Sequence, residues 1–279
     1  MKKVCVITGG SSGIGLAAAK QMDKENIVVL SGRSPQKLED AVHALRTLDI
    51  DARVFQGDVS DRESVLRLAE YAQQQGTVNS VIHSAGISPQ LGTPEKIFNI
   101  NAMGTIYMNE ELSKIMNTGG CIVDVASMSA YMLPFLLPDN MAAQENYELS
   151  LTEPEEFQKK MLDILSSVPG NLSDKVAYAL SKDFVVWYAA QCACFYGKRG
   201  IRVLSVSPGT FDTPMGQLEG ESAASYALKG ALGRVGQPDE IGSLLKFCIS
   251  DSASYLTGTD ILCDGGTMAA MKRAMQKQR

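Results

Sequence analysis

The chain has 279 residues, a length that allows one large α/β domain or two small ones. Its 45% hydrophobic and 20% charged residues are ordinary for a globular protein and exclude disorder, collagen and coiled coil for the whole chain. The net charge of −5 argues against a nucleic-acid partner, which needs a basic face, and no apolar run reaches the ~20 residues of a membrane span.

Runs rich in Val and Ile alternate with amphipathic stretches along most of the chain. Such runs are typical of strands buried on both faces of a parallel sheet, and we expect them at 3–8, 27–30, 53–56, 78–83, 121–126, 201–206 and 261–263. Helical patterns lie between them, at 13–22, 35–48, 62–75, 95–116, 175–197 and 239–250. The alternation predicts a single α/β domain over residues 1–279, a doubly wound parallel sheet of about seven strands with helices on both faces.

The start of the chain and its cysteines bear on location and on metals. The N-terminal apolar stretch, residues 4–8, is shorter than the core of a signal peptide, so we expect a cytoplasmic protein. The six cysteines and two histidines lack the clustered spacing of a structural zinc site, so we expect no metal.

One long segment, residues 131–172, breaks the alternation because it has no strand pattern. Pro134 and Pro138 interrupt its apolar start, where neither a helix nor a central strand accommodates proline easily. Residues 152–155 then have the pattern of a capping box, and apolar residues at helical spacing follow. We therefore expect a loop followed by a short amphipathic helix.

The first predicted strand runs into a glycine-rich segment, residues 8–15, that opens the next helix. Glycines let backbone N–H groups approach a pyrophosphate, and the helix N-terminus adds unpaired donors. A glycine turn without a ligand is the alternative. We expect a dinucleotide here, bound by Gly9, Ser11, Ser12, Gly13, Ile14 and Gly15.

The end of the second strand bears on which dinucleotide binds. It lacks the carboxylate that commonly accepts a hydrogen bond from the ribose of NAD, and it carries Arg33 instead. An arginine can bind a 2′-phosphate through two charge-assisted hydrogen bonds, so we favour NADP(H), with NAD(H) as the alternative. Asp58 and Val59 follow the third strand, where Asp58 either caps the next helix or reaches the adenine.

Further motifs follow in order: Asn101 in Asn-Ala-Met-Gly, Ser127 after the fifth strand, Tyr178 with Lys182 on one helix, and Pro208-Gly209 after the sixth strand. With the glycine-rich segment, they resemble the motifs of the short-chain dehydrogenase/reductases over nearly the whole chain. The resemblance implies a Rossmann-type fold and an enzyme that transfers hydride between a nicotinamide and a carbonyl or carbinol carbon. It assigns catalysis to Asn101, Ser127, Tyr178 and Lys182.

The chemistry of these side chains agrees with that assignment. Tyr178 and Lys182 are four residues apart and share one helix face. A phenol titrates near 10, so it needs a nearby ammonium to exchange a proton at neutral pH. Ser127 can donate a hydrogen bond to the substrate oxygen as charge develops on it. The resemblance implies that Asn101 holds a water in a proton relay toward Lys182.

The resemblance also implies cofactor contacts beyond the glycine-rich segment. Lys182 matches a ribose ligand and Thr213 matches the residue that holds the carboxamide, and the other matching positions are Ser84, Ala85, Gly86, Tyr178, Pro208, Gly209 and Phe211. This chain has His83-Ser84 where the family usually has two asparagines. We expect His83 to be a packed residue near the cofactor rather than a catalytic one.

The segment 131–172 lies between Ser127 and Tyr178, so it must emerge beside the predicted active site. A long insertion here is similar to that of bacterial 3α-hydroxysteroid dehydrogenase/carbonyl reductases. We expect its apolar side chains to line a substrate pocket: Phe135, Leu136, Leu137, Phe157, Met161 and Leu165. The substrate is then a small apolar ketone or alcohol, a steroid or bile acid, in contact with Ser127, Met128, Phe135, Tyr178 and Met215. A subunit contact or a surface loop is the alternative role of the insertion.

Two other functions compete with a hydroxysteroid dehydrogenase. A 3-oxoacyl thioester or general carbonyl reductase is the enzymatic alternative, although the acidic insertion disfavours a carrier-protein substrate. A nucleotide-sensing binding protein is the other, and it would not need all four catalytic residues. Because residues 184–196 are apolar on most faces of their helix, and the family packs this helix across a two-fold axis, we expect a homodimer or homotetramer.

Overall fold

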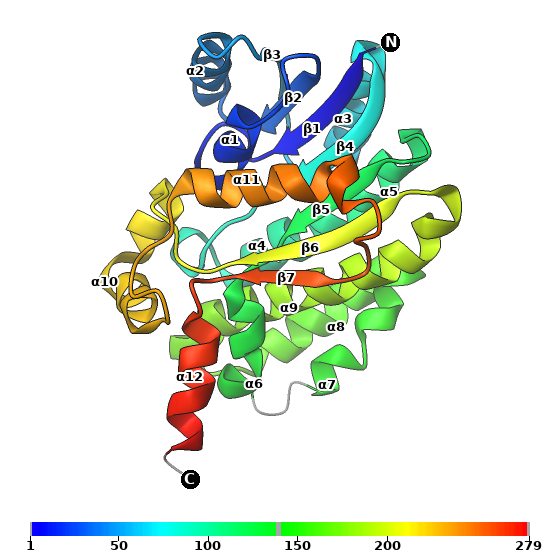
Figure 1. The fold of residues 1–279 in the computed structure, drawn as a ribbon. Coiled ribbons are helices and arrows are strands. Elements are labelled where there is room, and N and C mark those ends of the chain that lie inside the picture. Colours follow the sequence, from blue (N-terminus) through cyan, green and yellow to red (C-terminus); the bar gives the residue numbers. More distant parts are fainter. Residues whose placement is uncertain (1, 138–140, 278–279) are drawn as a thin grey trace.

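Seven parallel strands form one sheet in the computed structural model, which describes residues 2–137 and 141–277 (Figure 1). The strand order is β3-β2-β1-β4-β5-β6-β7. The strands are β1 (Lys3–Thr8), β2 (Ile27–Gly32), β3 (Asp51–Gln56), β4 (Thr77–His83), β5 (Cys121–Val125), β6 (Arg202–Pro208) and β7 (Asp260–Cys263). The predicted doubly wound sheet is confirmed, with each strand within a few residues of its predicted position.

Helices cover both faces of the sheet because its central strands are apolar on both sides. On one face lie α1 (Gly13–Lys20), α2 (Pro35–Arg46) and α11 (Pro238–Ile249). On the other lie α3 (Arg62–Gln75), α4 (Pro94–Phe98), α5 (Gly104–Ile115) and α9 (Gly170–Tyr196). None of the described helices is both long and apolar enough to cross a membrane.

The strand order reverses between β1 and β4, and this reversal positions the site. The chain runs from β1 outward to β2 and β3, then crosses back to β4 and proceeds outward on the other side. In open parallel sheets, ligands bind outside the carboxyl ends of the strands at such a point. Two further helices, α10 (Pro214–Lys229) and α12 (Thr267–Gln276), follow β6 and β7 at this end (Figure 1).

The helix predicted over 95–116 is not a uniform α-helix. Between α4 and α5 the residues Asn99–Met103 form a π-helical turn, and this turn contains Asn101. Such turns occur mostly as single insertions in α-helices, frequently at functional sites. The side chains around Asn101 keep the ordinary helical spacing in the sequence, so the pattern alone gives no sign of the wider turn.

The insertion is more helical than the sequence indicates. It contains α6 (Leu133–Leu136), α7 (Met141–Gln144), a 3₁₀ turn (Tyr147–Leu151) and α8 (Pro154–Ser166), while Pro138 lies outside the described residues. The predicted capping box is wrong: Glu153 precedes α8 and makes no side-chain cap. Thr152 does not take that role because its N–H donates to the Leu149 carbonyl and ends the 3₁₀ turn.

The apolar face of α8 packs into the protein core and not around a substrate. Phe157, Met161 and Leu165 are buried, and the Phe157 ring lies 4.6 Å from the ring of Phe184 on α9, centroid to centroid. The prediction that these three residues line a pocket is therefore wrong. Helical spacing identifies an apolar face but not what the face contacts. In α8 this face packs against α4 and α9 and so attaches the insertion to the rest of the protein.

Candidate active site

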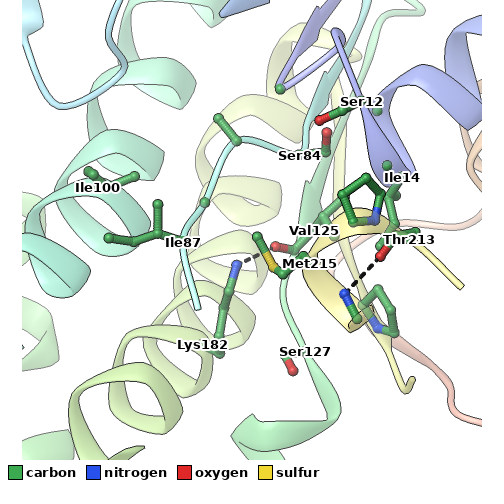
Figure 2. Close-up of a pocket in the computed structure, with 18 of the residues that line it drawn as sticks. Ser12, Ile14, Ser84, Ile87, Ile100, Val125, Ser127, Lys182, Thr213 and Met215 are labelled. Atoms are coloured by element: carbon green, nitrogen blue, oxygen red, sulfur yellow. Dashed lines mark hydrogen bonds between the residues drawn. The ribbon is translucent and has the colours of Figure 1, made fainter. Parts of the chain in front are cut away.

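A cavity of about 820 Å³ opens where β1 to β6 end. Its wall contains every residue that the sequence analysis assigns to the cofactor, from Gly9 in the glycine-rich segment to Thr213 after β6. Figure 2 shows Ser12 and Ile14 on one side of it, and Ser127 and Lys182 on the other. The fold thus brings together residues that are far apart in the sequence, and their individual roles stay predictions.

The glycine-rich segment fits a dinucleotide pyrophosphate because side chains are excluded where it turns. Gly9 has φ +63°, and a Cβ there would lie 3.0 Å from the Ala85 backbone nitrogen. A Cβ on Gly15 would lie 2.5 Å from the Gly9 carbonyl oxygen. Ser12 precedes α1 without capping it, so the first N–H groups of that helix keep the anion-binding capacity of a helix N-terminus.

Two exposed cations line the cavity on the side of the glycine-rich segment, at the end where the adenosine of a dinucleotide is expected. Arg33 follows β2, and Lys37 lies in the first turn of α2, where its N–H donates to the Ser34 hydroxyl. Within the described parts of the chain, neither side chain has a carboxylate partner. The sequence analysis missed Lys37; its place one helical turn after Arg33 is the signal that could have found it.

Asp58 lines the same end of the cavity and does not cap α3. Its Oδ1 accepts hydrogen bonds from the N–H and the hydroxyl of Ser60, at 3.0 and 2.7 Å. The residue that caps α3 is Asp61, whose side chain accepts from the N–H of Glu63. Of the two roles predicted for Asp58, the helix cap is wrong, and a contact to the adenosine end stays a prediction.

Lys182 reaches from α9 toward the end of β5. Its ammonium Nζ donates to the Val125 carbonyl at 2.8 Å and lies 6.0 Å from the centroid of the Tyr178 ring (Figure 2). Burial disfavours the charged form and lowers the pKa of Lys182 to about 8, an effect that the nearby Asp124 carboxylate opposes. Tyr178 and Ser127 line the cavity beside it, as predicted.

Asn101 lies behind the cavity wall. Its Oδ1 accepts from the N–H of Ile87 at 2.9 Å, and its Nδ2 donates to the Ile87 carbonyl at 3.1 Å and to the Ser181 hydroxyl at 3.2 Å. A Cβ on Gly86 would lie 3.0 Å from Asn101 Oδ1 and 3.4 Å from Lys182 Nζ. Asn101 therefore fixes the loop after β4 immediately beside Lys182, and its part in a proton relay stays a prediction.

A row of polar side chains crosses the sheet beneath the cavity. Thr8, His83, Asp124, Ser205 and Asp260 are successive register partners on β1, β4, β5, β6 and β7. Thr8 Oγ1 lies 2.8 Å from His83 Nδ1, and the Ser205 hydroxyl donates to Asp260 at 2.6 Å. The Asp124 carboxylate accepts from the side-chain amide of Asn109 on α5 at 2.8 Å.

Burial controls the charge of two members of this row. It lowers the pKa of His83 to about 3, with a smaller effect of Lys182 in the same direction, so the imidazole is neutral. It raises the pKa of the Asp124 carboxyl to about 7, although the Asn109 hydrogen bond and Lys182 favour the charged form. His83 is only 2% exposed and bonded to Thr8, which agrees with the packed residue that we expected.

The substrate side of the cavity differs from the prediction at several residues of the insertion. Met128 and Met215 line it as expected. Phe135 and Leu137 do not, and Phe135 is 51% exposed. Leu136 lines the wall as expected, together with Met132, which the sequence analysis missed. The remaining missed residues on this side include Lys175 and Tyr226. Lys175 lies three residues before Tyr178, a spacing that could have indicated a shared helix face.

Comparisons with known proteins agree with this geometry. The family model described as short chain dehydrogenase matches residues 3–138, and the one described as enoyl-(acyl carrier protein) reductase matches 162–268. The short-chain dehydrogenase/reductase bsc3 of Alternaria brassicicola is 30% identical over 278 residues, which are 98% of each chain. The 3-oxoacyl-(acyl-carrier-protein) reductase of Thermotoga maritima is 28% identical over 95% of this chain and 97% of its own.

Solved structures share the fold. A short chain dehydrogenase from Burkholderia cenocepacia, in complex with NADP, has a TM-score of 0.75 over 95% of this chain and 98% of its own. Its sequence identity of 24% supports the architecture alone. The matches over nearly the whole chain, together with the placement of Ser127, Tyr178 and Lys182, show that the chain belongs to the short-chain dehydrogenase/reductase family, oxidoreductases that act on CH–OH or carbonyl groups.

Proposed function

We propose that the protein interconverts a bulky apolar secondary alcohol and its ketone, with a hydroxysteroid or bile acid as the favoured substrate and NADP(H) as the favoured cofactor. The reaction type rests on one observation: a single cavity is lined by the glycine-rich segment at one end and by Ser127, Tyr178 and Lys182 at the other. We also propose that the reaction takes place in the cytoplasm.

A bound nicotinamide supplies the hydride in the reducing direction and accepts it in the oxidising direction. Tyr178 gives its phenolic proton to the substrate oxygen during reduction and takes it back during oxidation. The Lys182 ammonium lowers the free energy of the Tyr178 phenolate, because a nearby positive charge favours the charged form of an acid. The Ser127 hydroxyl donates to the substrate oxygen and stabilises the charge that develops on it.

The preference for NADP(H) is supported by Arg33 and Lys37. Both cations line the adenosine end and lack a carboxylate partner in the described residues, so neither must give up an ion pair to bind a phosphate. Arg33 offers a planar donor pair that matches phosphate geometry, and Lys37 adds a second positive charge.

The preference for a bulky substrate is supported by the apolar part of the cavity wall. Met128, Met132, Leu136 and Met215 contribute flexible apolar surface there, which suits a large ring system. A 3-oxoacyl thioester is the second candidate, and the 28% identity to the Thermotoga maritima 3-oxoacyl reductase favours it. Both substrates require the same three catalytic side chains.

A substrate panel separates these candidates. Nicotinamide absorbance is followed with NADP(H) and NAD(H) in parallel against hydroxysteroids, oxo bile acids, an acetoacetyl thioester and small secondary alcohols. Turnover confined to one steroid position supports the proposal. Turnover of the thioester alone would replace the steroid with the second candidate, and turnover of small alcohols alone would indicate a general carbonyl reductase.

A further inference from the structure

The charged side chains on the cavity wall can be divided by their place in the fold. Among the described residues, five charged side chains line it: Arg33, Lys37, Asp58, Lys175 and Lys182. The first three lie at the carboxyl ends of β2 and β3, at the adenosine end. Lys182 is buried beside the reacting groups. Lys175 is left without a part in cofactor binding or in catalysis.

The position of Lys175 on α9 places it on the substrate side. Lys175, Tyr178 and Lys182 are separated by three and then four residues, so they lie along one helix face. Three residues of an α-helix rise about 4.5 Å, so Lys175 lies about one turn from the reacting phenol. Lys182 lies one turn to the other side, deep in the protein. The helix face therefore runs from the buried lysine through Tyr178 to an exposed lysine at the cavity mouth.

Nothing in the described structure neutralises Lys175. None of the carboxylates whose side chains the structure describes lies within ion-pair distance of it, although other exposed lysines, such as Lys159 on α8, have such a partner. The other residues of the cavity wall outside the adenosine end, apart from Lys182, are uncharged, among them Met132, Leu136 and Tyr226. An ammonium beside an apolar wall is a poor site for a neutral steroid edge and a good site for an anion, because charge-assisted hydrogen bonds are about twice as strong as neutral ones.

The phosphates of the cofactor are not the anion that Lys175 would meet. The pyrophosphate is expected at the glycine-rich segment before α1, and a 2′-phosphate is expected at Arg33. Both sites lie at the ends of β1 and β2. Lys175 instead lies near the start of α9, about one turn before Tyr178. An anion at Lys175 must therefore belong to the substrate.

We propose that the substrate is an oxo or hydroxy carboxylic acid whose carboxylate binds Lys175 while its carbonyl or carbinol carbon lies at Tyr178 and Ser127. This inference rests on the proposed function and narrows it from apolar ketones and alcohols to those with an acidic group at the far end. Lys175 acts as a specificity residue: it selects and orients the substrate and takes no part in proton or hydride transfer.

The test compares acids with their own neutral esters. The ketones are 4-oxocyclohexanecarboxylate and an oxo cholanic acid, each beside its methyl ester, at pH 7 where the carboxylates are ionised. For the wild-type protein we expect a higher kcat/KM for each acid that fits than for its ester. In Lys175→Ala the acid-to-ester ratio should fall about tenfold, the range of a lost charge-assisted hydrogen bond. Lys175→Glu should lower it further, and Lys175→Arg should restore it.

Lys159→Ala is the matched control, since it removes an exposed lysine from a helix outside the cavity and should leave the ratio unchanged. An equal loss for acid and ester in Lys175→Ala would overturn the inference and leave the proposed function intact. If the wild-type protein reduces none of the ketones, the proposed substrate class fails. The inference is then decided by calorimetry of the acids with the NADPH complex: weaker binding in Lys175→Ala supports it, and equal or absent binding overturns it.

Discussion

Gly86 lies beside two side chains, those of Asn101 and Lys182, to which we assign a part in the proposed reaction. A Cβ at this residue would be 3.0 Å from Asn101 Oδ1 and 3.4 Å from Lys182 Nζ, so one or both must move. Because a small misplacement of catalytic groups can cost about 100-fold in rate, we expect Gly86→Ala to lower kcat by about 10- to 100-fold. Gly197→Ala, whose Cβ would meet nothing within 4 Å, is the control. Steady-state kinetics that give both variants the wild-type kcat would contradict this role of Gly86.

Arg33 is the residue on which the cofactor preference depends most. Replacing it with Glu removes a phosphate ligand and adds repulsion, so we expect KM for NADP to rise about 100-fold and KM for NAD to change only a few-fold. The ratio of kcat/KM for the two cofactors is the measurement. Arg46→Glu reverses a charge at the far end of α2, outside the cavity wall, and should leave the ratio as it is. An unchanged ratio in Arg33→Glu would remove the NADP assignment.

At the scale of elements, α8 stabilises the fold through one aromatic cluster. Phe157 is fully buried among the rings of Phe98, Tyr147 and Phe184. Phe157→Ala should lower the free energy of unfolding by about 3–5 kcal/mol, measured by urea denaturation. Phe135→Ala makes the same change on the half-exposed side of the insertion and should cost much less. Equal small losses would mean that the insertion is only loosely attached.

The elements also show what the sequence could and could not predict. Strand runs buried on both faces and the glycine-rich turn depend on local residue types, so the sheet and the cofactor end were predictable. The face of α8 was visible as a pattern, but the pattern does not say whether Phe157 meets the core or a ligand. Lys37 and Lys175 gave only a weak signal, their spacing from Arg33 and Tyr178, because an exposed lysine on a helix is ordinary until the fold places it on a cavity wall.

For the whole molecule, the buried His83 gives stability a pH dependence. Its pKa is about 3 in the folded chain, against an ordinary value of 6.5, so only the unfolded chain takes up this proton on mild acidification. The contribution of His83 to the free energy of unfolding is fully present above pH 6.5 and is lost as the pH falls. This contribution decreases by about 2 kcal/mol between pH 7.5 and 5. Asp124, with its raised pKa, acts in the opposite direction.

Comparison with a variant isolates the histidine. His83→Asn introduces the residue usual in the family and removes the titrating group. Urea denaturation at pH 7.5 and pH 5 should show that the variant loses about 2 kcal/mol less than the wild-type protein over this interval. The same loss in both proteins would mean that His83 is protonated in the folded chain.

Assembly is the remaining property of the whole molecule, and the expected homodimer or homotetramer stays a prediction. Twelve of the 27 residues of α9 are buried within one chain, and Phe195 near its end is 55% exposed. A single exposed ring is ordinary, so the mass in solution must decide. Light scattering should give two or four times 30.0 kDa, and a monomeric mass would contradict the expectation.

The polar row beneath the cavity has a consequence for how the strands find their alignment. Side chains alternate between the two faces of a strand, so sliding β5 by one residue would turn Asp124 toward the apolar cluster that contains Leu204 and Ile241. The slip would also separate its carboxylate from Asn109. A misaligned sheet would thus bury the carboxyl without its hydrogen bond from Asn109, which makes the error costly. The same alignment of β5 positions the Val125 carbonyl that binds Lys182, and it positions Ser127, which follows the strand. Correct strand pairing and a correctly arranged active site therefore depend on the same register.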